Sequence, residues 1–113
     1  MEHTLDTHDG VTVVALKGDI DVSKAPALRD LLGQVMDGSS TRVLLDLTDV
    51  EFLDSSGLGL LVTAHRRAAD SGWAFGVAGA GSSVSRVFEL TRTTRLLRIF
   101  VSRQEGVDAL RAL

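Results

Sequence analysis

Apolar and polar residues alternate along the chain in short blocks that predict strands. Residues 11–17 are rich in β-branched side chains and lie between two glycines, which indicates a strand. The Asp9-Gly10 pair before it is a typical hairpin turn, so we expect residues 4–8 to pair with this strand. Residues 42–47 form the short apolar run of a central strand covered on both faces. Two more strands are predicted at residues 73–78 and 97–101.

Between the strands, apolar residues recur every three or four positions, a spacing that predicts helices. The first helix is expected after Ser23, which can cap it, with Pro26 in its first turn. The second is expected over residues 56–71 and should end before Gly72. Its first two turns are apolar nearly all round, so we expect the start of this helix to be buried.

Two more helices are predicted in the C-terminal third of the chain. Ser82 or Ser83 can cap the third helix, and Ser102 with Glu105 forms a capping box that opens the fourth. Strands and helices therefore alternate, and crossover helices of this length link parallel strands. We expect a single α/β domain over residues 1–113, with a small mixed β-sheet and about four helices packed on it.

Composition and charge narrow the class of function. No apolar run reaches the roughly 18 residues that a membrane-spanning helix needs, the acidic start lacks an export signal and cysteine is absent, so we expect a cytoplasmic protein with no membrane partner. The net charge of −3 gives no general attraction to nucleic acid. Residues 1–54 carry 11 acidic and 4 basic side chains, whereas residues 55–113 carry 4 acidic and 8 basic ones. The acidic half is either a docking surface for a basic partner or a solvated face.

The segment Asp54-Ser55-Ser56-Gly57-Leu58-Gly59 joins the central strand to the apolar second helix. Asp54 or Ser55 can cap this helix, and the seryl hydroxyls at its N-terminus would be exposed. Gly57 and Gly59 each cost about 1 kcal/mol relative to alanine inside a helix. The two glycines either let another backbone approach the first turn or permit tight packing on the sheet.

This segment, together with Val-Leu-Leu-Asp-Leu-Thr-Asp-Val-Glu-Phe-Leu at residues 43–53, resembles the signature of the STAS-domain anti-sigma factor antagonists. Leu-Lys-Gly-Asp-Ile-Asp at residues 16–21 is similar to the first strand of that family and its exit. The later elements come in matching order. The resemblance therefore covers nearly the whole chain and implies the STAS fold.

The resemblance also implies a partner-switching cycle. The unphosphorylated antagonist binds an anti-sigma factor that is also a serine kinase, and the sigma factor is released. The kinase phosphorylates the first serine after the aspartate, here Ser55, which turns binding off, and a serine phosphatase restores the protein. Ser56 matches the unmodified neighbour. The antagonist itself would not be an enzyme and would need no cofactor.

The residues expected to contact the partner surround Ser55. They are Asp19, Asp21, Asp54, Ser56, Gly57, Leu58 and Gly59. Asp19 and Asp21 match a family position near the phosphorylation site, although two acids after a strand can equally form a turn and a helix cap. The protein is expected to be a monomer or a weak dimer.

Other motifs carry weaker signals. The glycine-rich residues 76–81 lack the third glycine of a dinucleotide fingerprint and the lysine of a P-loop. The three histidines have no cysteine or carboxylate at a spacing diagnostic of a metal site. Ser55 does not lie in a Gly-x-Ser-x-Gly motif, and the distant His65 is the remaining candidate for a base. We therefore expect no catalytic residue and no metal.

Two alternative functions remain open. One is a phosphotransfer receiver domain, in which Asp46, Asp49 or Asp54 would accept the phosphate. Receivers have a similar length and element order, but their mechanism expects a lysine after the last strand, and no lysine occurs beyond Lys24. The other is a constitutive STAS scaffold or interaction module that is not controlled by phosphorylation.

Overall fold

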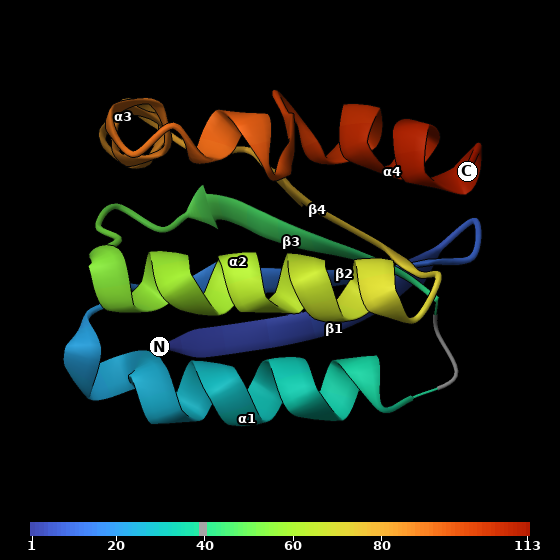
Figure 1. Ribbon diagram of the computed structural model, residues 1–113, viewed down its shortest axis with the longest axis horizontal. Helices are drawn as coiled ribbons and strands as arrows, with labels where there is room; N and C mark the ends of the chain where they lie inside the picture. The colour runs from blue at the N-terminus through green and yellow to red at the C-terminus, as the bar shows by residue number, and fades with distance from the viewer. Residues whose placement is uncertain (39–40) are drawn as a thin grey trace.

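The computed structural model describes residues 1–38 and 41–113, and within these residues strands and helices alternate as predicted (Figure 1). Five strands form one sheet in the order β1-β2-β3-β4-β5. The strands are β1 (Glu2–His8), β2 (Val11–Lys17), β3 (Arg42–Asp49), β4 (Ala74–Ala78) and β5 (Arg98–Phe100). Strands β1 and β2 are antiparallel, and the other neighbouring pairs are parallel, so the predicted mixed sheet is confirmed.

Four α-helices and two short 3-10 helices connect the strands in the described part of the chain. The α-helices are α1 (Ala25–Met36), α2 (Ser55–Asp70), α3 (Ser82–Leu90) and α4 (Arg103–Arg111), and the 3-10 helices are η1 (Val22–Lys24) and η2 (Thr93–Arg95). None of the helices in residues 1–38 and 41–113 is long and apolar enough to span a membrane. The α/β class and the number of helices agree with the expectation from the sequence.

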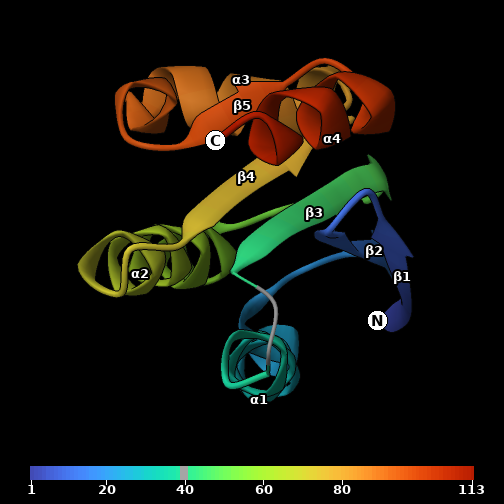
Figure 2. The same ribbon diagram turned by 90° about the vertical axis from the view of Figure 1, so that its right-hand side faces the viewer.

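The sheet has helices on both faces (Figure 2). Helices α1 and α2 lie on one face and α4 lies on the other. Because side chains alternate along a strand, Val43, Leu45 and Leu47 of β3 point into the larger core with α1 and α2, whereas Leu44 joins the smaller core with α4. This burial on both faces explains why β3 reads as a continuous apolar run.

The hairpin between β1 and β2 has the predicted turn. Asp9 and Gly10 both have positive φ, +52° and +80°, as a two-residue hairpin turn of the mirror-image type requires. His8 and Val11 are the first facing pair of the ladder. The aspartate-glycine pair therefore sets the register of the hairpin.

Two helix starts differ from the predictions. Ser23 does not cap α1; instead, Asp21 caps η1 by accepting a 2.9 Å hydrogen bond from the backbone N–H of Ser23. A carboxylate two residues earlier is the stronger acceptor, and the chain makes a 3-10 turn before α1 begins at Ala25. Neither Ser82 nor Ser83 caps α3, because the extended residue at its N-cap is Gly81 and both serines already lie inside the helix. Ser102 does cap α4, by accepting from the N–H of Glu105 at 3.1 Å.

Candidate functional site

The connection from β3 to α2 runs beside the exit of β2. The backbone N–H of Ile20 donates to the carbonyl of Phe52 at 2.8 Å, and the N–H of Asp54 donates to the carbonyl of Ile20 at 3.1 Å. Ile20 and Leu53 thus form a parallel bridge that continues the pairing of β2 with β3 past the ends of both strands. Both side chains are buried, so the acids on either side of Ile20 are held next to the start of α2.

Asp54, and not Ser55, is the N-cap of α2. Its Oδ1 accepts hydrogen bonds from the backbone N–H groups of Ser56 (2.9 Å) and Gly57 (3.2 Å). Ser55 is therefore the first residue of the helix and is exposed, whereas Ser56 is half-buried. The hydroxyl of Ser55 makes no hydrogen bond to any residue in the described part of the chain. The Ser56 hydroxyl likewise makes no hydrogen bond within these residues, so Ser55 is distinguished by its greater exposure at a helix end that is already capped.

The two glycines of the motif have different surroundings. A Cβ atom on Gly57 would lie 2.5 Å from Leu53 Cδ1 and 2.7 Å from Ile20 Cγ2, closer than real atoms approach. A Cβ atom on Gly59 would meet nothing within 4 Å. Gly57 therefore lets α2 start tightly against the Ile20–Leu53 bridge, and Gly59 leaves its part of the exposed helix surface bare.

The predicted partner-binding residues divide into exposed and buried groups. Asp19 and Gly59 are exposed, and Asp21, Asp54 and Ser56 are half-buried. Gly57 and Leu58 are buried under the helix start, so they shape the site but offer little surface of their own to a partner. That these residues bind a partner stays a prediction.

Asp21 serves the local structure as well as the site. Its carboxylate accepts from the side chain and the backbone N–H of Ser23. The hydrogen bond from the Ser23 hydroxyl is the main cause that holds the pKa of Asp21 below its ordinary value, and burial acts in the opposite direction. The helix-cap reading of Asp21 is therefore correct, and Asp19 remains the acid with an unrestricted carboxylate.

The structure adds two apolar residues that the sequence gives no reason to place at the surface. Val22 and Phe52 are 69% and 49% exposed, and they lie beside Asp21 and Asp54 on the two segments that flank the Ile20–Leu53 bridge. Apolar residues near a strand end are expected to be buried, so periodicity alone would assign both to the core. Exposed apolar side chains surrounded by polar residues are typical of a protein-binding surface.

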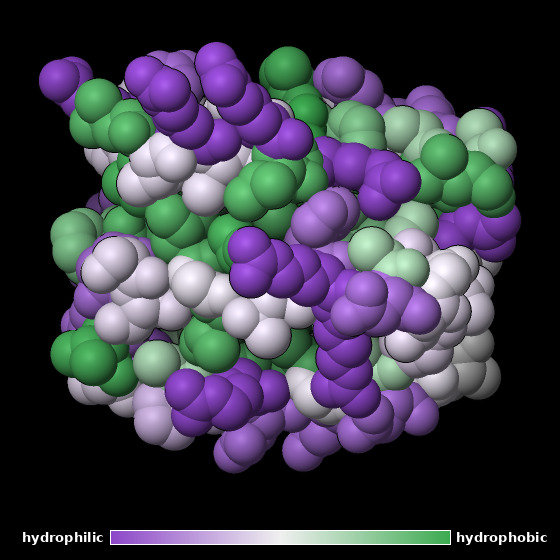
Figure 3. All heavy atoms as spheres, viewed as in Figure 1, coloured by the Kyte–Doolittle hydropathy of each residue, from purple (hydrophilic) through white to green (hydrophobic). Residues whose placement is uncertain are grey.

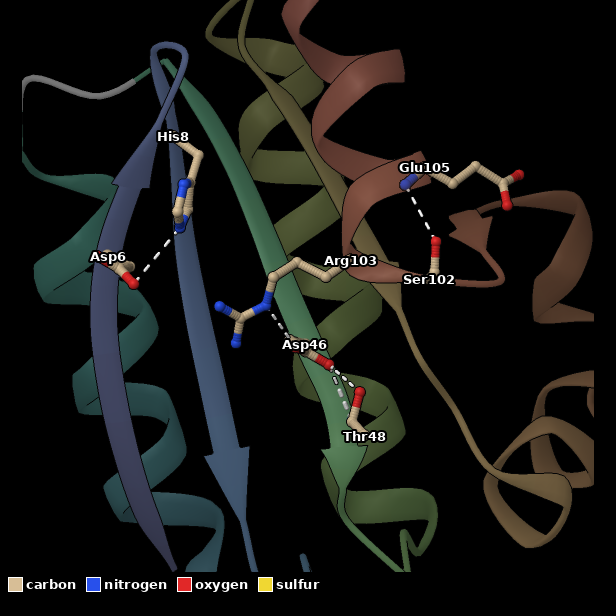
Figure 4. A network of polar contacts seen from close by, with 7 residues as sticks. All are labelled: Asp6, His8, Asp46, Thr48, Ser102, Arg103 and Glu105. Atoms are coloured by element: carbon tan, nitrogen blue, oxygen red, sulfur yellow. Dashed lines mark hydrogen bonds and ion pairs between the residues drawn. The ribbon is translucent and has the colours of Figure 1, made fainter.

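A separate polar network joins β3 to α4 (Figure 4). Arg103 Nε donates to Asp46 Oδ2 at 2.8 Å, and the side chain and backbone N–H of Thr48 donate to Asp46 Oδ1 at 2.6 and 3.0 Å. Burial acts to raise the pKa of Asp46, but the hydrogen bonds from Thr48 and Arg103 outweigh it and hold this pKa below its ordinary value. Both carboxylate oxygens of Asp46 are occupied, and the residue is 5% exposed.

The three aspartates considered for a receiver mechanism have different surroundings. Both carboxylate oxygens of Asp46 are hydrogen-bonded and one oxygen of Asp54 caps α2, whereas Asp49 is exposed. Within residues 1–38 and 41–113, no group of three or more metal-ligating side chains lies together. His65 is ten residues along α2 from Ser55, roughly 15 Å at the rise of an α-helix, which is too far for a base.

Known proteins match this chain along nearly its whole length. The family model described as "Mlab, STAS domain" matches residues 3–98. The anti-sigma-F factor antagonist RsfB of Mycobacterium tuberculosis is 32% identical over 108 residues, which are 96% of this chain and 88% of RsfB. A crystal structure of an anti-sigma factor antagonist from Mycobacterium paratuberculosis is 32% identical and superposes with a TM-score of 0.90 over 97% of this chain and 93% of its own.

The Bacillus cell fate determinant SpoIIAA in its phosphorylated form has the same fold at lower identity. It superposes with a TM-score of 0.71 at 18% identity, over 96% of this chain and 98% of its own. Together with the family model and the match to RsfB, this shared fold places the chain in the STAS domain family.

Proposed function

We propose that this protein is an anti-sigma factor antagonist whose binding surface surrounds Ser55 and is switched off when Ser55 is phosphorylated. The observation that carries the proposal is the free, exposed hydroxyl of Ser55 at the first position of α2, beside a helix cap that Asp54 already supplies. A kinase can reach this hydroxyl without breaking any hydrogen bond of the fold.

The comparisons support the first half of this proposal. The relative from M. tuberculosis is named an anti-sigma-F factor antagonist, and it matches 96% of this chain at 32% identity. SpoIIAA is known in both an unphosphorylated and a phosphorylated form, which supports a phosphorylation switch on this fold. The expected partners are an anti-sigma factor that is also a serine kinase and a separate serine phosphatase, and the place of action is the cytoplasm.

The physics of the site supports a switch that leaves the fold intact. A phosphate on Ser55 adds about −1.5 to −2 charges and three acceptor oxygens. At the N-terminus of α2 the helix dipole favours negative charge by about 0.3–1 kcal/mol, which offsets part of the repulsion from Asp54. The antagonist can therefore carry the phosphate without unfolding.

The same charge would weaken a complex. A partner surface that fits the neutral Ser55 and the acids around it would meet additional negative charge and three oxygens that need hydration. A loss of about 1.4 kcal/mol already lowers affinity tenfold. The protein thus acts by binding, and phosphorylation controls how much of it can bind.

Binding to the cognate anti-sigma factor tests this proposal through three substitutions of one residue. We expect Ser55→Ala and Ser55→Asn to bind as the unmodified protein does, and Ser55→Asp to bind at least about tenfold more weakly. Asparagine matches aspartate in size but carries no charge, so it separates electrostatics from bulk. Equal affinities for the asparagine and aspartate variants, measured by calorimetry, would contradict a charge switch and favour a constitutive scaffold.

A further inference from the structure

The chain folds back tightly after α3 and presents arginines and leucines to the solvent. We call this the α3–η2 surface; it consists of Arg86, Glu89, Leu90, Arg92, Arg95 and Leu96, all exposed, and carries three arginines and one glutamate. Leu90 is 73% and Leu96 is 48% exposed. No ion pair is formed by these three arginines within the described residues. Figure 3 shows hydrophilic residues beside hydrophobic ones at the top left, where Figure 1 places α3.

The backbone of Arg92 indicates that its side chain is needed at this surface. Arg92 has φ +59° and ψ +21°, the left-handed conformation, just after the end of α3. Glycine is the usual residue at such a position, and an ordinary side chain costs about 1–2 kcal/mol there. Thr93 and Leu97 of this turn are buried, so the turn is packed against the core without the arginine side chain. A long cation at a strained, exposed position points to a role in binding.

A second surface of the same chain has the opposite charge and a similar apolar content. This acidic rim consists of Asp19, Asp21, Val22, Glu51 and Phe52. It carries three carboxylates, and Lys24 is the base that acts on Asp21. Val22 and Phe52 are its exposed apolar residues, as Leu90 and Leu96 are those of the α3–η2 surface. The two surfaces therefore carry opposite charges, and each has two exposed apolar side chains.

We propose that the protein forms a weak two-fold dimer in which the α3–η2 surface of each copy faces the acidic rim of the other. Helix α3 and the start of α2 both lie toward the left end of the molecule in Figure 1. Glu51 of the acidic rim lines the same hollow as the first residues of α3, so the two surfaces are neighbours. A two-fold rotation brings each surface of one copy onto the oppositely charged surface of the other, so both contacts form in one closed interface. The arginines then find carboxylate partners, and the four exposed apolar side chains are covered.

The dimer involves the surface next to Ser55. Its acidic rim flanks the segment that leads into α2, so a second copy bound there would compete with an anti-sigma factor. That competition rests on the proposed function, whereas the dimer itself does not.

Sedimentation velocity of the purified protein, without any partner, tests the proposal. We expect a monomer–dimer equilibrium in about 50 mM NaCl whose dissociation constant rises about tenfold or more in about 500 mM NaCl, because the shorter Debye length screens the exposed charges. The Arg92→Glu/Arg95→Glu variant should be monomeric at the concentrations where the unmodified protein dimerises. Arg29→Glu/Arg66→Glu changes the net charge equally on exposed arginines outside both surfaces and should leave the equilibrium unchanged.

A charge-swapped pair provides the decisive experiment. The Asp19→Arg/Glu51→Arg variant should also be monomeric alone, and mixing it with Arg92→Glu/Arg95→Glu should restore a heterodimer. A strictly monomeric unmodified protein, chains longer than a dimer, a dimer that survives both reversals, or a failure of the mixture to associate would overturn the proposal. None of these results depends on whether Ser55 is phosphorylated.

Discussion

Gly57 and Gly59 lie two residues apart in one turn of α2, and their different surroundings separate packing from function. Gly57 is buried where the helix meets Leu53 and Ile20, and no larger residue fits there without displacing them. Gly59 faces open space, so nothing in the fold requires a glycine at this position. A residue that weakens its own helix without a packing reason is expected to serve a partner.

Substituting alanine for each glycine gives a matched pair. We expect Gly57→Ala to lower the free energy of unfolding by about 1–3 kcal/mol, since the new methyl group overpacks the Ile20–Leu53 bridge. Gly59→Ala should raise it by up to about 1 kcal/mol, because alanine is the better helix former. Urea denaturation of both variants measures the two effects. Equal changes in the same direction would show that the packing account of Gly57 is wrong.

Single residues of the site were partly predictable. The cap, the exposed serine and the glycine pair follow from local chemistry, and the sequence indicates Ser55 without any structure. Val22 and Phe52 were not predictable, because their exposure depends on the pairing of two segments more than 30 residues apart. The acids beside Ile20 fit either a docking rim or a turn and a helix cap, and the structure shows that Asp21 caps η1.

At the scale of elements, the order and type of helices and strands could be predicted because periodicity and turn residues are local signals. Which of several neighbouring residues caps a helix could not be predicted, since the choice depends on small differences in backbone geometry. The hydrogen bonds among Asp46, Thr48 and Arg103 could not be predicted from the sequence either. It joins β3 to the start of α4 across 57 residues and lies on the sheet face opposite α1 and α2.

This network predicts a specific stability change. Arg103→Met keeps the apolar stem but removes the cation that faces the buried carboxylate, and we expect a loss of about 1–3 kcal/mol at neutral pH. Arg111→Met is the control, because Arg111 pairs with Asp9 on the surface and its loss should cost less than about 1 kcal/mol. Thermal or urea unfolding of both variants provides the comparison.

The stability lost in Arg103→Met should depend on pH, and the pKa of Asp46 fixes the direction of that dependence. The pKa of Asp46 in the folded protein lies below its ordinary value of 3.8, so its stabilising contribution is present above that value and is lost as the pH falls through the folded pKa. The difference between the unmodified protein and Arg103→Met should therefore shrink in strong acid. A difference that stays constant from neutral pH down to acid unfolding would contradict the assignment of Asp46 as a charged partner.

At the scale of the whole molecule, the carboxyl ends of the parallel strands β2 and β3 lie next to the start of α2, where Ser55 is exposed. The α/β class could be predicted from the alternation of elements, but the strand order could not, because which strands become neighbours is decided by long-range contacts. The uneven charge along the sequence becomes two surfaces of opposite sign. The acidic one flanks the segment that leads to Ser55, and the basic one lies on α3 and the turn that follows it.

The central claim is that Ser55 is the residue through which this protein is switched. Incubation with the cognate anti-sigma kinase and ATP, followed by intact-mass measurement and peptide mapping, tests it most directly, with Ser55→Ala as the control. The account predicts a single added phosphate on Ser55 that is stable in acid, and no addition to the Ser55→Ala variant. No modification in the presence of an active cognate kinase, or an acid-labile phosphate on an aspartate, would contradict it.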